Sequence, residues 1–570
     1  MTTNAQPETQ SVQRLVVVGG VAGGMSSAAR ARRLSDSTEI IVLEQGAEVS
    51  FANCGLPYFV GGEIQEESAL RVQTTASLKA SLNLDVRTHS KVIALDAAKR
   101  EITVDGPDGQ NTLTYDALVL SPGGVAATPP ITGLNDSHRV KTLRTVPDAV
   151  EMRDIVDSGA KRAVVLGAGF IGLEAAEALA MRGLDTTIVE LAPHVLPPLE
   201  DELATLASNA LRDLNITVRA GVGAQAIESG ADHDVVVLSD GTRLDADLIV
   251  LSVGVRPDTA VFEQAGIATE RGSIVIDEHG RTNLEGVYAV GDATVSTHAI
   301  TGARRPVALA GPANRAGRLV SDFIFNPSTA RELPKPKATA IVRIGEYGVA
   351  MTGANSSELK AAGIEFETVH LHPLNHASYF PGAQNIALIV HFAPVTGQIL
   401  GAQAVAKEGA DKRIDVIATA IRGGLTITDL IDIDLSYSPP FGSAKDPVNL
   451  AGMMGENVLT GTTKLWYPGE LTAVLDDALL LDVRGAGEFA QRHVRGAVNI
   501  PHIQVRERLD EIRELAGDRP VRVMCHSGMR SYIAHRILDQ AGFDSKTLSG
   551  GIVTLSSWLG DDASDVLEIA

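Results

Sequence analysis

The sequence has 570 residues with a formal net charge of −21, and 44% of its residues are hydrophobic and 21% charged. This length predicts three or four domains of ordinary globular composition, and the negative charge disfavours nucleic acid and anionic membranes as partners. No apolar run reaches the roughly 18 to 20 residues of a membrane span, and the N-terminal MTTNAQPETQ lacks the features of a secretory signal, so we expect a cytoplasmic location.

The chain contains only two cysteines, Cys54 and Cys525. Two distant cysteines cannot form a disulfide framework, nor can they build a zinc or iron–sulfur site that needs several thiolates. We therefore predict no metal site. A lone cysteine is usually a small buried hydrophobe, so the neighbours of each cysteine must decide whether it is reactive.

The first predicted elements form a β-turn-α-β unit. The segment RLVVVGGVAGGMSSAARARRL begins with a buried strand, turns through glycines and continues as a helix, and EIIVLE supplies the next strand. Such a unit directs backbone N–H groups at a pyrophosphate, and an acidic residue about twenty positions on accepts a hydrogen bond from a ribose. Val21 stands where the second glycine usually is. The predicted contacts are Gly19, Ala22, Gly23, Gly24 and Glu44.

Cys54 follows this unit in the segment SFANCGLPYFVGG. It therefore lies on the element that leads away from the first nucleotide turn. No second cysteine lies four residues away, so an internal disulfide cannot form there. A lone thiolate can be oxidised to a mixed disulfide, a persulfide or a sulfenic acid, and these three states belong to different enzymes.

A second nucleotide unit follows in KRAVVLGAGFIGLEAAEALAMRG. Here the complete G-x-G-x-x-G pattern is present as Gly167, Gly169 and Gly172, and the strand TTIVE ends in Glu190. Two dinucleotides are therefore predicted. An acidic residue at the end of that strand favours an unphosphorylated ribose, so NADH is favoured over NADPH.

The segment TNLEGVYAVGDA places Asp292 directly after a buried strand, where a carboxylate can bind a hydroxyl of a polyol. Together these segments resemble the flavoprotein disulfide reductases that bind two dinucleotides. The resemblance implies that the first unit binds FAD, with Asp292 at its ribityl chain, and that the second binds the nicotinamide cofactor.

The context S-F-x-N-C-G-L-P-Y narrows the resemblance to the coenzyme A disulfide reductase branch, in which a single cysteine is active. NADH peroxidases and oxidases of the superfamily use a sulfenic acid and carry a histidine in the first glycine-rich helix. This chain has Met25, Ser26 and Ser27 in that stretch, which argues against peroxide chemistry.

Two later segments, HASYFPGA with Tyr379 and LSYSPPFG with Tyr437, flank KEGADKRIDVIATA, which is characteristic of the family's dimerisation domain. The resemblance implies that both tyrosines reach the reactive sulfur of the partner subunit in a homodimer. A tyrosine hydroxyl can donate a hydrogen bond to a leaving thiolate. The resemblance also implies a coenzyme A groove lined by Ser26, Arg30, Arg33, Ser50 and Asn53.

The last part of the chain changes to a compact α/β pattern. RPVRVMCHSGMRSYIAHRIL gives a buried strand that ends at Cys525, a glycine-containing loop and a helix. A loop of this kind turns N–H groups toward the thiol, and Arg530 adds a positive charge. With LDVR and LSGGIVTLSSW, the segment resembles a rhodanese domain. Dual-specificity phosphatases have a loop one residue longer, so sulfur chemistry is favoured over phosphate chemistry.

We therefore predict an α/β protein with two Rossmann-like dinucleotide-binding domains, an α+β dimerisation domain and a C-terminal α/β rhodanese domain. The predicted ranges are 12–121 and 285–330 for the FAD domain, 122–284 for the NAD(P)H domain, 331–455 for the dimerisation domain, 456–470 for a linker and 471–570 for the rhodanese domain.

The resemblance implies an NAD(P)H-dependent reductase of coenzyme A persulfide, polysulfide or disulfide that acts through Cys54, with Cys525 moving sulfane sulfur. A small thiol or persulfide would be its substrate. Two alternatives stay open. One is an NADH oxidase or peroxidase that uses a Cys54 sulfenic acid, and the other is a sulfur-carrier or redox-sensing protein with little turnover.

Overall fold

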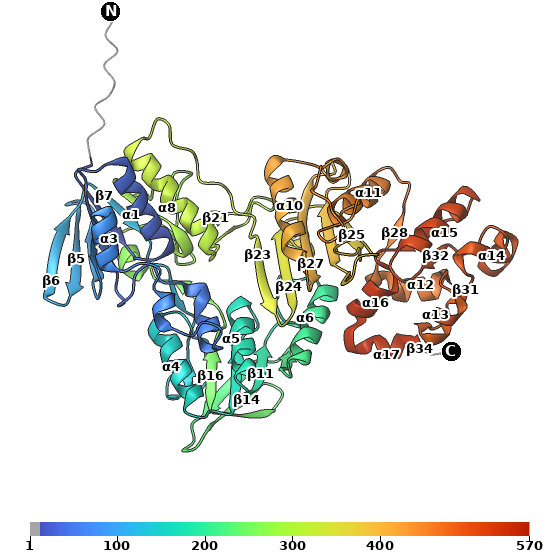
Figure 1. Cartoon of the computed structure of the whole chain (residues 1–570), viewed down its shortest axis with the longest axis horizontal. Helices are drawn as coiled ribbons and strands as arrows, with labels where there is room; N and C mark the ends of the chain where they lie inside the picture. Colours follow the sequence, from blue (N-terminus) through green and yellow to red (C-terminus); the bar gives the residue numbers. More distant parts are fainter. Residues whose placement is uncertain (1–11, 569–570) are drawn as a thin grey trace, which may run out of the picture. The chain divides into compact units, whose positions relative to one another are not determined.

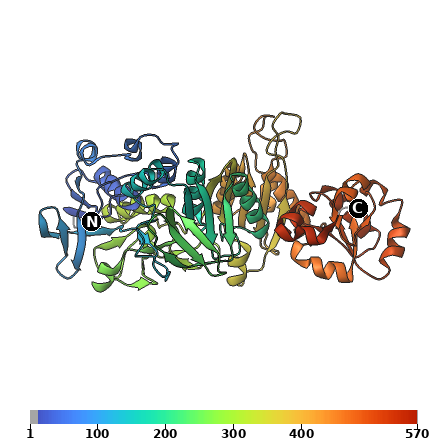
Figure 2. The ribbon, with the colours of Figure 1, turned by 90° about the horizontal axis from the view of Figure 1, so that it is seen from below.

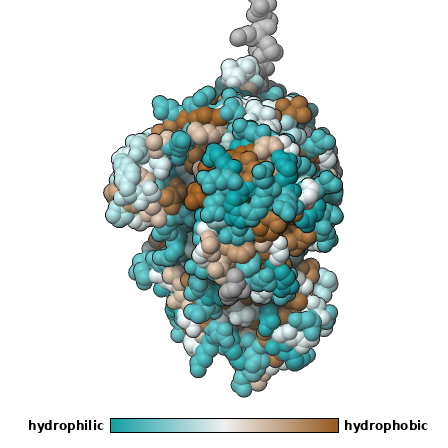
Figure 3. Space-filling view, turned by 90° about the vertical axis from the view of Figure 1, so that its right-hand side faces the viewer, coloured by the Kyte–Doolittle hydropathy of each residue, from teal (hydrophilic) through white to brown (hydrophobic). Residues whose placement is uncertain are grey.

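The computed structural model describes residues 12–568. The chain divides into two compact units, one made of Met1–Val189 with Val222–Pro336 and the other of Glu190–Gly221 with Lys337–Ala570. Within residues 12–568 no helix is long and apolar enough to cross a membrane. The face of the surface seen in Figure 3 is mostly hydrophilic, with small apolar patches between the polar side chains.

Five parallel strands form the sheet that carries the first glycine-rich turn (Figure 1). Its central strand β1 (Arg14–Val18) is apolar and almost fully buried, as expected for a parallel strand covered on both faces. Helix α1 (Ala22–Leu34) packs along α8 (Ala310–Phe325). A Cβ atom at Gly317 would lie 2.1 Å from the carbonyl oxygen of Gly23, so these helices approach closely only because position 317 is glycine. In spatial order the strands are β20 (Val287–Ala289), β7 (Ala117–Leu120), β1, β2 (Glu39–Leu43) and β3 (Asp85–Arg87).

A second parallel sheet repeats this arrangement around the second glycine-rich turn. Strand β10 (Arg162–Leu166) lies between β11 (Asp185–Glu190) and β16 (Leu248–Leu251), and β16 pairs with β9 (Val140–Lys141). Helix α5 (Phe170–Met181) follows β10 after the turn. The same unit contains two antiparallel sheets, β4 (Lys91–Asp96), β5 (Glu101–Gly106) and β6 (Gly109–Thr114), and β13 (Ala224–Glu228), β14 (Asp234–Leu238) and β15 (Arg243–Ala246).

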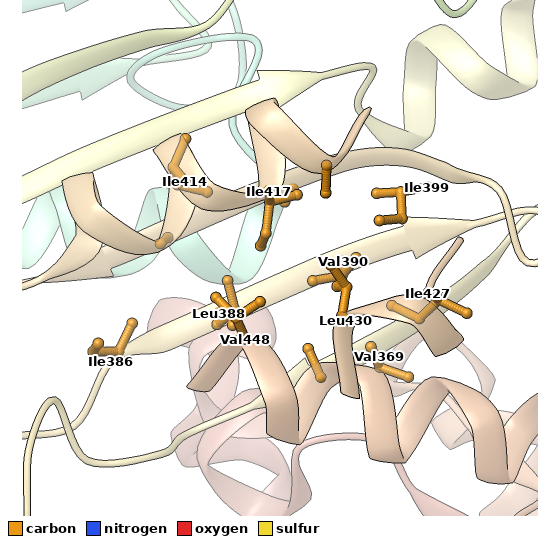
Figure 4. Close-up of a cluster of buried hydrophobic side chains, with 14 of the residues drawn as sticks. Val369, Ile386, Leu388, Val390, Ile399, Ile414, Ile417, Ile427, Leu430 and Val448 are labelled. Carbon is orange, nitrogen blue, oxygen red and sulfur yellow. The ribbon is translucent and has the colours of Figure 1, made fainter. Parts of the chain in front are cut away.

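The second unit contains a five-stranded antiparallel sheet whose strand β26 (Ala387–Phe392) is buried on both faces. Because side chains alternate along a strand, Leu388 and Val390 join one core with Ile417 of α10 and Val448 of α11 (Figure 4). On the other face, Ala387 and Ile389 line a small cavity with Glu202 and Leu203 of α6. The elements are β23 (Ala340–Ile344), β24 (Tyr347–Gly353), β27 (Ile399–Ala406), β26 and β25 (Glu367–Leu371) in spatial order, with α6 (Asp201–Asp213), α10 (Ala410–Gly423) and α11 (Pro447–Leu459).

The C-terminal part is a parallel sheet with helices around it, so the predicted α/β fold with two Rossmann-like sheets, an antiparallel sheet and a rhodanese-like sheet is confirmed. Within the segment 456–470, α11 continues to Leu459 and Trp466 belongs to an edge strand of this sheet, with its side chain fully buried. The sheet has β28 (Leu465–Trp466), β33 (Ser545–Leu548), β32 (Val521–Met524), β29 (Leu479–Asp482) and β31 (Val498–Asn499) in spatial order, with helices α12 (Leu471–Asp477), α13 (Ala486–Gln491), α14 (Leu509–Ala516), α15 (Met529–Gln540) and α16 (Gly551–Leu559).

Candidate functional site

The first glycine-rich turn is shaped to receive a dinucleotide. Gly19 has φ +97°, and a Cβ atom there would lie 2.0 Å from the carbonyl oxygen of Ser121. A Cβ atom at Gly24 would lie 2.0 Å from the carbonyl oxygen of Gly19. Val21, at the N-cap of α1, offers no side-chain hydrogen bond, so the first N–H groups of the helix have no side-chain cap. These features fit the pyrophosphate of FAD.

The carboxylate of Glu44 lies beside this turn. Its two oxygens accept hydrogen bonds from the backbone N–H groups of Gly20, at 2.8 Å, and Gly46, at 2.7 Å. The end of β2 therefore holds an acceptor against the glycine turn, where the ribose of a dinucleotide would bind.

Ser121 joins the turn to the segment of Asp292, and it is a residue that the sequence analysis missed. A Cβ atom at Gly23 would lie 2.9 Å from the Ser121 hydroxyl, and one at Gly291 would lie 3.6 Å from it. Burial raises the pKa of the Asp292 carboxyl, whereas the charge of Arg144 lowers it. A half-buried carboxylate beside a dinucleotide turn fits a cofactor hydroxyl. The signal for Ser121 was its position at the end of β7, which pairs with β1.

Cys54 lies on a single 3₁₀ turn, η1 (Asn53–Gly55), directly before α2 (Leu56–Val60). The residue is exposed, yet loss of water around its thiol raises the pKa, and the negative charge of Glu174 raises it further. Glu174 lies on α5 and accepts a hydrogen bond of 3.3 Å from the Tyr58 hydroxyl. The sequence analysis missed Tyr58 and Glu174, although Glu174 lies two residues after Gly172 on the helix that begins at the second turn.

Replacing Glu174 with glutamine should lower the pKa of the Cys54 thiol, because a neutral amide removes one of the two causes that raise it. The thiolate is the reactive form. In a Cys525→Ser background, alkylation of Cys54 by iodoacetamide should therefore reach half of its maximal rate at a lower pH. Tyr58→Phe keeps the Glu174 charge and should shift that midpoint less. An unchanged midpoint in Glu174→Gln would contradict the assignment.

The five predicted coenzyme A residues fall into two groups. Ser26, Arg30 and Arg33 lie on α1 at helical spacing, so they share one face of that helix. Ser50, with φ +47°, donates its backbone N–H to the carbonyl oxygen of Gly20 at 2.9 Å, and Asn53 lies beside Cys54.

Two of these side chains are bonded to side chains of α8 in the folded chain. The Arg30 guanidinium forms a 2.5 Å ion pair with Asp322 of α8, and the Ser26 hydroxyl donates to Asn314 at 2.5 Å. An anionic ligand that binds Arg30 would compete with Asp322. The role of all five residues in binding coenzyme A remains a prediction.

The second glycine-rich turn has an open position at its centre. Gly167 has φ +100°, and a Cβ atom at Gly172 would lie 2.0 Å from the carbonyl oxygen of Gly167. At Gly169, by contrast, a Cβ atom would meet no protein atom within 4 Å. A glycine with free space around it is explained when the protein backbone must come close to a bound ligand at that position. Glu190 ends β11, and its carboxylate accepts a 2.8 Å hydrogen bond from the N–H of Ala192.

The structure brings Tyr379 and Tyr437 together, with their hydroxyl oxygens 3.1 Å apart. Both residues lie in loops outside the helices and strands. Figure 2 shows loops that project from the part of the ribbon coloured between yellow and orange. Both residues are exposed, and the hydrogen bond to Tyr437 raises the pKa of Tyr379. Two protonated hydroxyls at one exposed point can serve a ligand that approaches from outside this unit.

Cys525 directly follows β32 and is almost fully buried. The backbone N–H of Gly528 donates to its Sγ atom at 3.2 Å. The carbonyl oxygen of Cys525 accepts from Ile552 N–H at 2.9 Å, and that of His526 accepts from Val553 N–H at 3.1 Å. One loop amide, that of Gly528, therefore points at the sulfur, and the first amides of α16 hold the loop through its carbonyl groups.

Arg530, predicted to assist Cys525, has a carboxylate partner that the sequence analysis missed. Both of its terminal nitrogens bond to Glu488 of α13, at 2.6 and 2.8 Å. These hydrogen bonds hold the pKa of Glu488 at about 2, although partial burial raises it. The guanidinium is thus fixed near the loop by a bidentate ion pair. The spacing offered no signal for Glu488, because it lies 42 residues away in sequence.

Three family models match the chain. Residues 13–315 match "Pyridine nucleotide-disulphide oxidoreductase", and residues 339–447 match the dimerisation domain of the same group. Residues 467–557 match "Rhodanese-like domain". Together these matches cover each part of the chain in which a candidate residue lies.

Several known proteins are similar to this chain. The coenzyme A disulfide reductase of Staphylococcus haemolyticus is 32% identical over 445 residues, which cover 77% of this chain and 99% of that protein. The structure of reduced Bacillus anthracis CoADR-RHD is 37% identical with a TM-score of 0.93, covering 96% of this chain and 98% of that chain. The NAD-dependent persulfide reductase from A. fulgidus is 34% identical with a TM-score of 0.88, covering 95% and 99%.

Proposed function

Because the chain belongs to the pyridine nucleotide-disulphide oxidoreductase family and carries a C-terminal rhodanese-like domain, we propose that it reduces coenzyme A persulfide with electrons from NADH. The chain is an NAD(P)H-dependent disulfide or persulfide oxidoreductase. The family implies FAD and NAD(P)H as its cofactors. The persulfide and the preference for NADH are our proposals.

One observation carries the proposal: the chain has a single cysteine in the segment that follows the first nucleotide-binding unit and a second in the rhodanese loop. With no neighbouring thiol, Cys54 can store oxidation only by bonding to a sulfur of the substrate or to oxygen. Cys525, whose sulfur accepts a hydrogen bond from the Gly528 loop amide, suits a protein persulfide. Sulfane sulfur handled at Cys525 and reduction at Cys54 together favour a persulfide over a plain disulfide.

In the proposed reaction the Cys54 thiolate attacks the coenzyme A sulfur of the persulfide. The S–S bond breaks, hydrosulfide leaves, and Cys54 becomes a mixed disulfide with coenzyme A. Bound FAD would supply the two-electron chemistry that carries electrons from the nicotinamide to this disulfide. Two electrons and a proton then restore the Cys54 thiolate and release coenzyme A thiol, so the sum is coenzyme A persulfide, NADH and a proton giving coenzyme A, hydrogen sulfide and NAD⁺.

Two further groups have roles in this scheme. We assign Tyr379 and Tyr437 of one subunit to donate hydrogen bonds to the thiolate that leaves at Cys54 of the other, which requires a homodimer. The matched dimerisation domain and the 3.1 Å approach of the two hydroxyls support this assignment. Cys525 would attack the outer sulfur of a donor, release the donor thiol and hold the sulfur as a persulfide.

Steady-state oxidation of NADH by the flavin-loaded protein tests the substrate. We expect kcat/KM to be higher with coenzyme A persulfide than with coenzyme A disulfide, and hydrogen sulfide to form in step with NADH loss. A higher value with the disulfide would make the disulfide the substrate. Equal NADH loss in air without a thiol acceptor, with matching peroxide or water, would identify an oxidase. Negligible turnover with every acceptor would favour a sulfur carrier.

A further inference from the structure

Two parallel chains of hydrogen bonds run from the N-terminal end of α6 through the antiparallel sheet. Each consists of a glutamate, a histidine and a hydroxyl residue. We call Glu202, His370 and Ser549 the rhodanese-facing chain, because Ser549 belongs to the C-terminal sheet region. We call Glu200, His391 and Thr368 the sheet-facing chain, because it ends within the antiparallel sheet. All six residues lie in the second compact unit.

The rhodanese-facing chain is short and buried. His370 Nε2 lies 2.6 Å from a Glu202 carboxylate oxygen, and His370 Nδ1 lies 2.7 Å from the Ser549 hydroxyl. The side chains of His370 and Glu202 are 7% and 12% exposed, and Ser549 is fully buried. The carboxylate can only accept, so Nε2 carries the proton. Ser549 also accepts from the His370 backbone N–H at 3.2 Å, so two groups of His370 hold the Ser549 hydroxyl.

Ser549 is the first residue of a tight turn that supports the sulfur loop. Gly550 and Gly551, which follow it, have φ of +71° and +67°. A Cβ atom at Gly550 would lie 2.8 Å from Cβ of His370, and one at Gly551 would lie 2.7 Å from the carbonyl oxygen of Cys525. This turn, residues 549–551, therefore contacts the histidine on one side and the sulfur loop on the other.

The turn also starts α16, whose first amides hold the loop. Ile552 and Val553 donate to the carbonyl oxygens of Cys525 and His526, which fixes the peptide planes that precede Gly528. The N–H of Gly528 then points at the cysteine sulfur. A second contact ties the same helix to the antiparallel sheet, because His372 Nε2 lies 2.7 Å from the Thr554 hydroxyl. A shift of the 549–551 turn would move the Gly528 amide that donates to the sulfur.

We propose that Glu202, His370 and Ser549 are positioning residues for sulfur transfer at Cys525. By clamping the 549–551 turn, they keep the Gly528 amide aimed at the sulfur, so that the rhodanese-like domain is competent while it is docked on the antiparallel sheet. The inference rests on the proposed sulfur chemistry of Cys525. It adds three residues from outside the loop, two of them outside the rhodanese-like match, to that chemistry.

The sheet-facing chain provides a matched control. His391 Nε2 lies 3.0 Å from Glu200, and His391 Nδ1 lies 2.9 Å from the Thr368 hydroxyl. Burial raises the pKa of Glu200, but hydrogen bonds from His391 and Ser356 outweigh it and hold the pKa at about 2. Thr368 bonds to Tyr467 through its backbone, and within residues 12–568 no hydrogen bond joins it to the sulfur loop. Loss of its hydroxyl removes an equally buried hydrogen bond without touching the 549–551 turn.

Transfer of sulfur from thiosulfate to cyanide by the full-length protein tests the proposal. The Cys525 thiolate attacks the sulfane sulfur, the S–S bond breaks and sulfite leaves; cyanide then takes the outer sulfur as thiocyanate and restores the thiolate. We expect Ser549→Ala and Glu202→Leu to lower kcat by about tenfold to a hundredfold, since small misplacements of reacting groups cost that much. KM for thiosulfate should change by less than about twofold, because the binding surface is intact.

Glu202→Gln keeps a carbonyl oxygen that can accept a hydrogen bond from His370, so it should retain most of the sulfur-transfer activity. If Glu202 only filled space, Glu202→Gln and Glu202→Leu would have similar activities. Thr368→Val should leave sulfur transfer unchanged, and all four variants should keep NADH-driven reduction at Cys54. In a Cys54→Ser background, Ser549→Ala should also speed alkylation of the buried Cys525 by iodoacetamide.

The outcomes separate the two proposals. If the protein without substitutions formed no thiocyanate, this would count against sulfur transfer at Cys525. The alkylation rates would still test the positioning role. If the rates of sulfur transfer and of Cys525 alkylation were unchanged in Ser549→Ala, the inference would be overturned, whereas the proposed function would stand. An equal loss in Thr368→Val would also overturn it, because the effect would then be one of general stability.

Discussion

Cys54→Ser should lose NADH-driven reduction of coenzyme A persulfide and coenzyme A disulfide by about a thousandfold or more. A serine hydroxyl cannot form the mixed disulfide on which the proposed reaction depends, and removal of a covalent nucleophile has effects of this order. The other cysteine, Cys525, belongs to the rhodanese-like domain, so it cannot replace the cysteine that follows the first nucleotide-binding unit. NADH oxidation and release of hydrogen sulfide should be measured together at saturating NADH.

Cys525→Ser is the matched control for this prediction. It removes the other thiol by the same one-atom change and should keep reduction of small coenzyme A substrates, while sulfur transfer from thiosulfate to cyanide is lost. The visible absorbance of bound flavin should be equal in both variants, which shows that the cofactor site is intact. Substantial reductase activity in Cys54→Ser would rule out the proposed mechanism.

Asp446→Ala should destabilise the protein by about 3 to 5 kcal/mol, because it leaves a buried guanidinium without its counter-charge. Arg413 and Asp446 have side chains only 2% and 5% exposed, and they are joined by hydrogen bonds of 2.8 and 3.3 Å. Asp446 also caps α11 through the N–H of Val448. The free energy of unfolding should be measured from urea curves monitored by a probe of the second unit.

This ion pair also bears on the proposed reaction. Arg413 donates to the carbonyl oxygen of Asn375 at 2.7 Å, and Ala377 N–H donates to the carbonyl oxygen of Gly442 at 2.9 Å. These contacts tie together the segments that carry Tyr379 and Tyr437. Reductase activity of Asp446→Ala should therefore fall even at temperatures where the protein is still folded.

Glu346→Ala is the control for the stability measurement. Glu346 pairs with Lys407 at 2.6 Å, but their side chains are 78% and 35% exposed. An exposed ion pair contributes about 1 kcal/mol or less. If the two variants lost similar stability, the Arg413–Asp446 pair would not have the role that its burial implies.

Local pattern predicted much of this molecule. The glycines of both nucleotide turns, the acidic residues that end β2 and β11, and the loop after Cys525 depend on neighbours within about 25 residues, so spacing along the sequence was informative. The lone cysteines limited the chemistry because a missing thiol is visible without any structure. The three family matches agree with the resemblance drawn from those motifs.

Tertiary structure alone decided which distant groups surround each reactive atom. Glu174 lies 116 residues from Tyr58, its partner beside Cys54, and Ser549 lies 179 residues from His370. No periodicity links such residues, because their approach is set by how strands and helices pack and not by local backbone geometry. The sequence by itself determined the kinds of site and the two sulfur atoms. The fold decided the charges, hydrogen bonds and burial that control them, since these depend on contacts that form only when remote elements share one core.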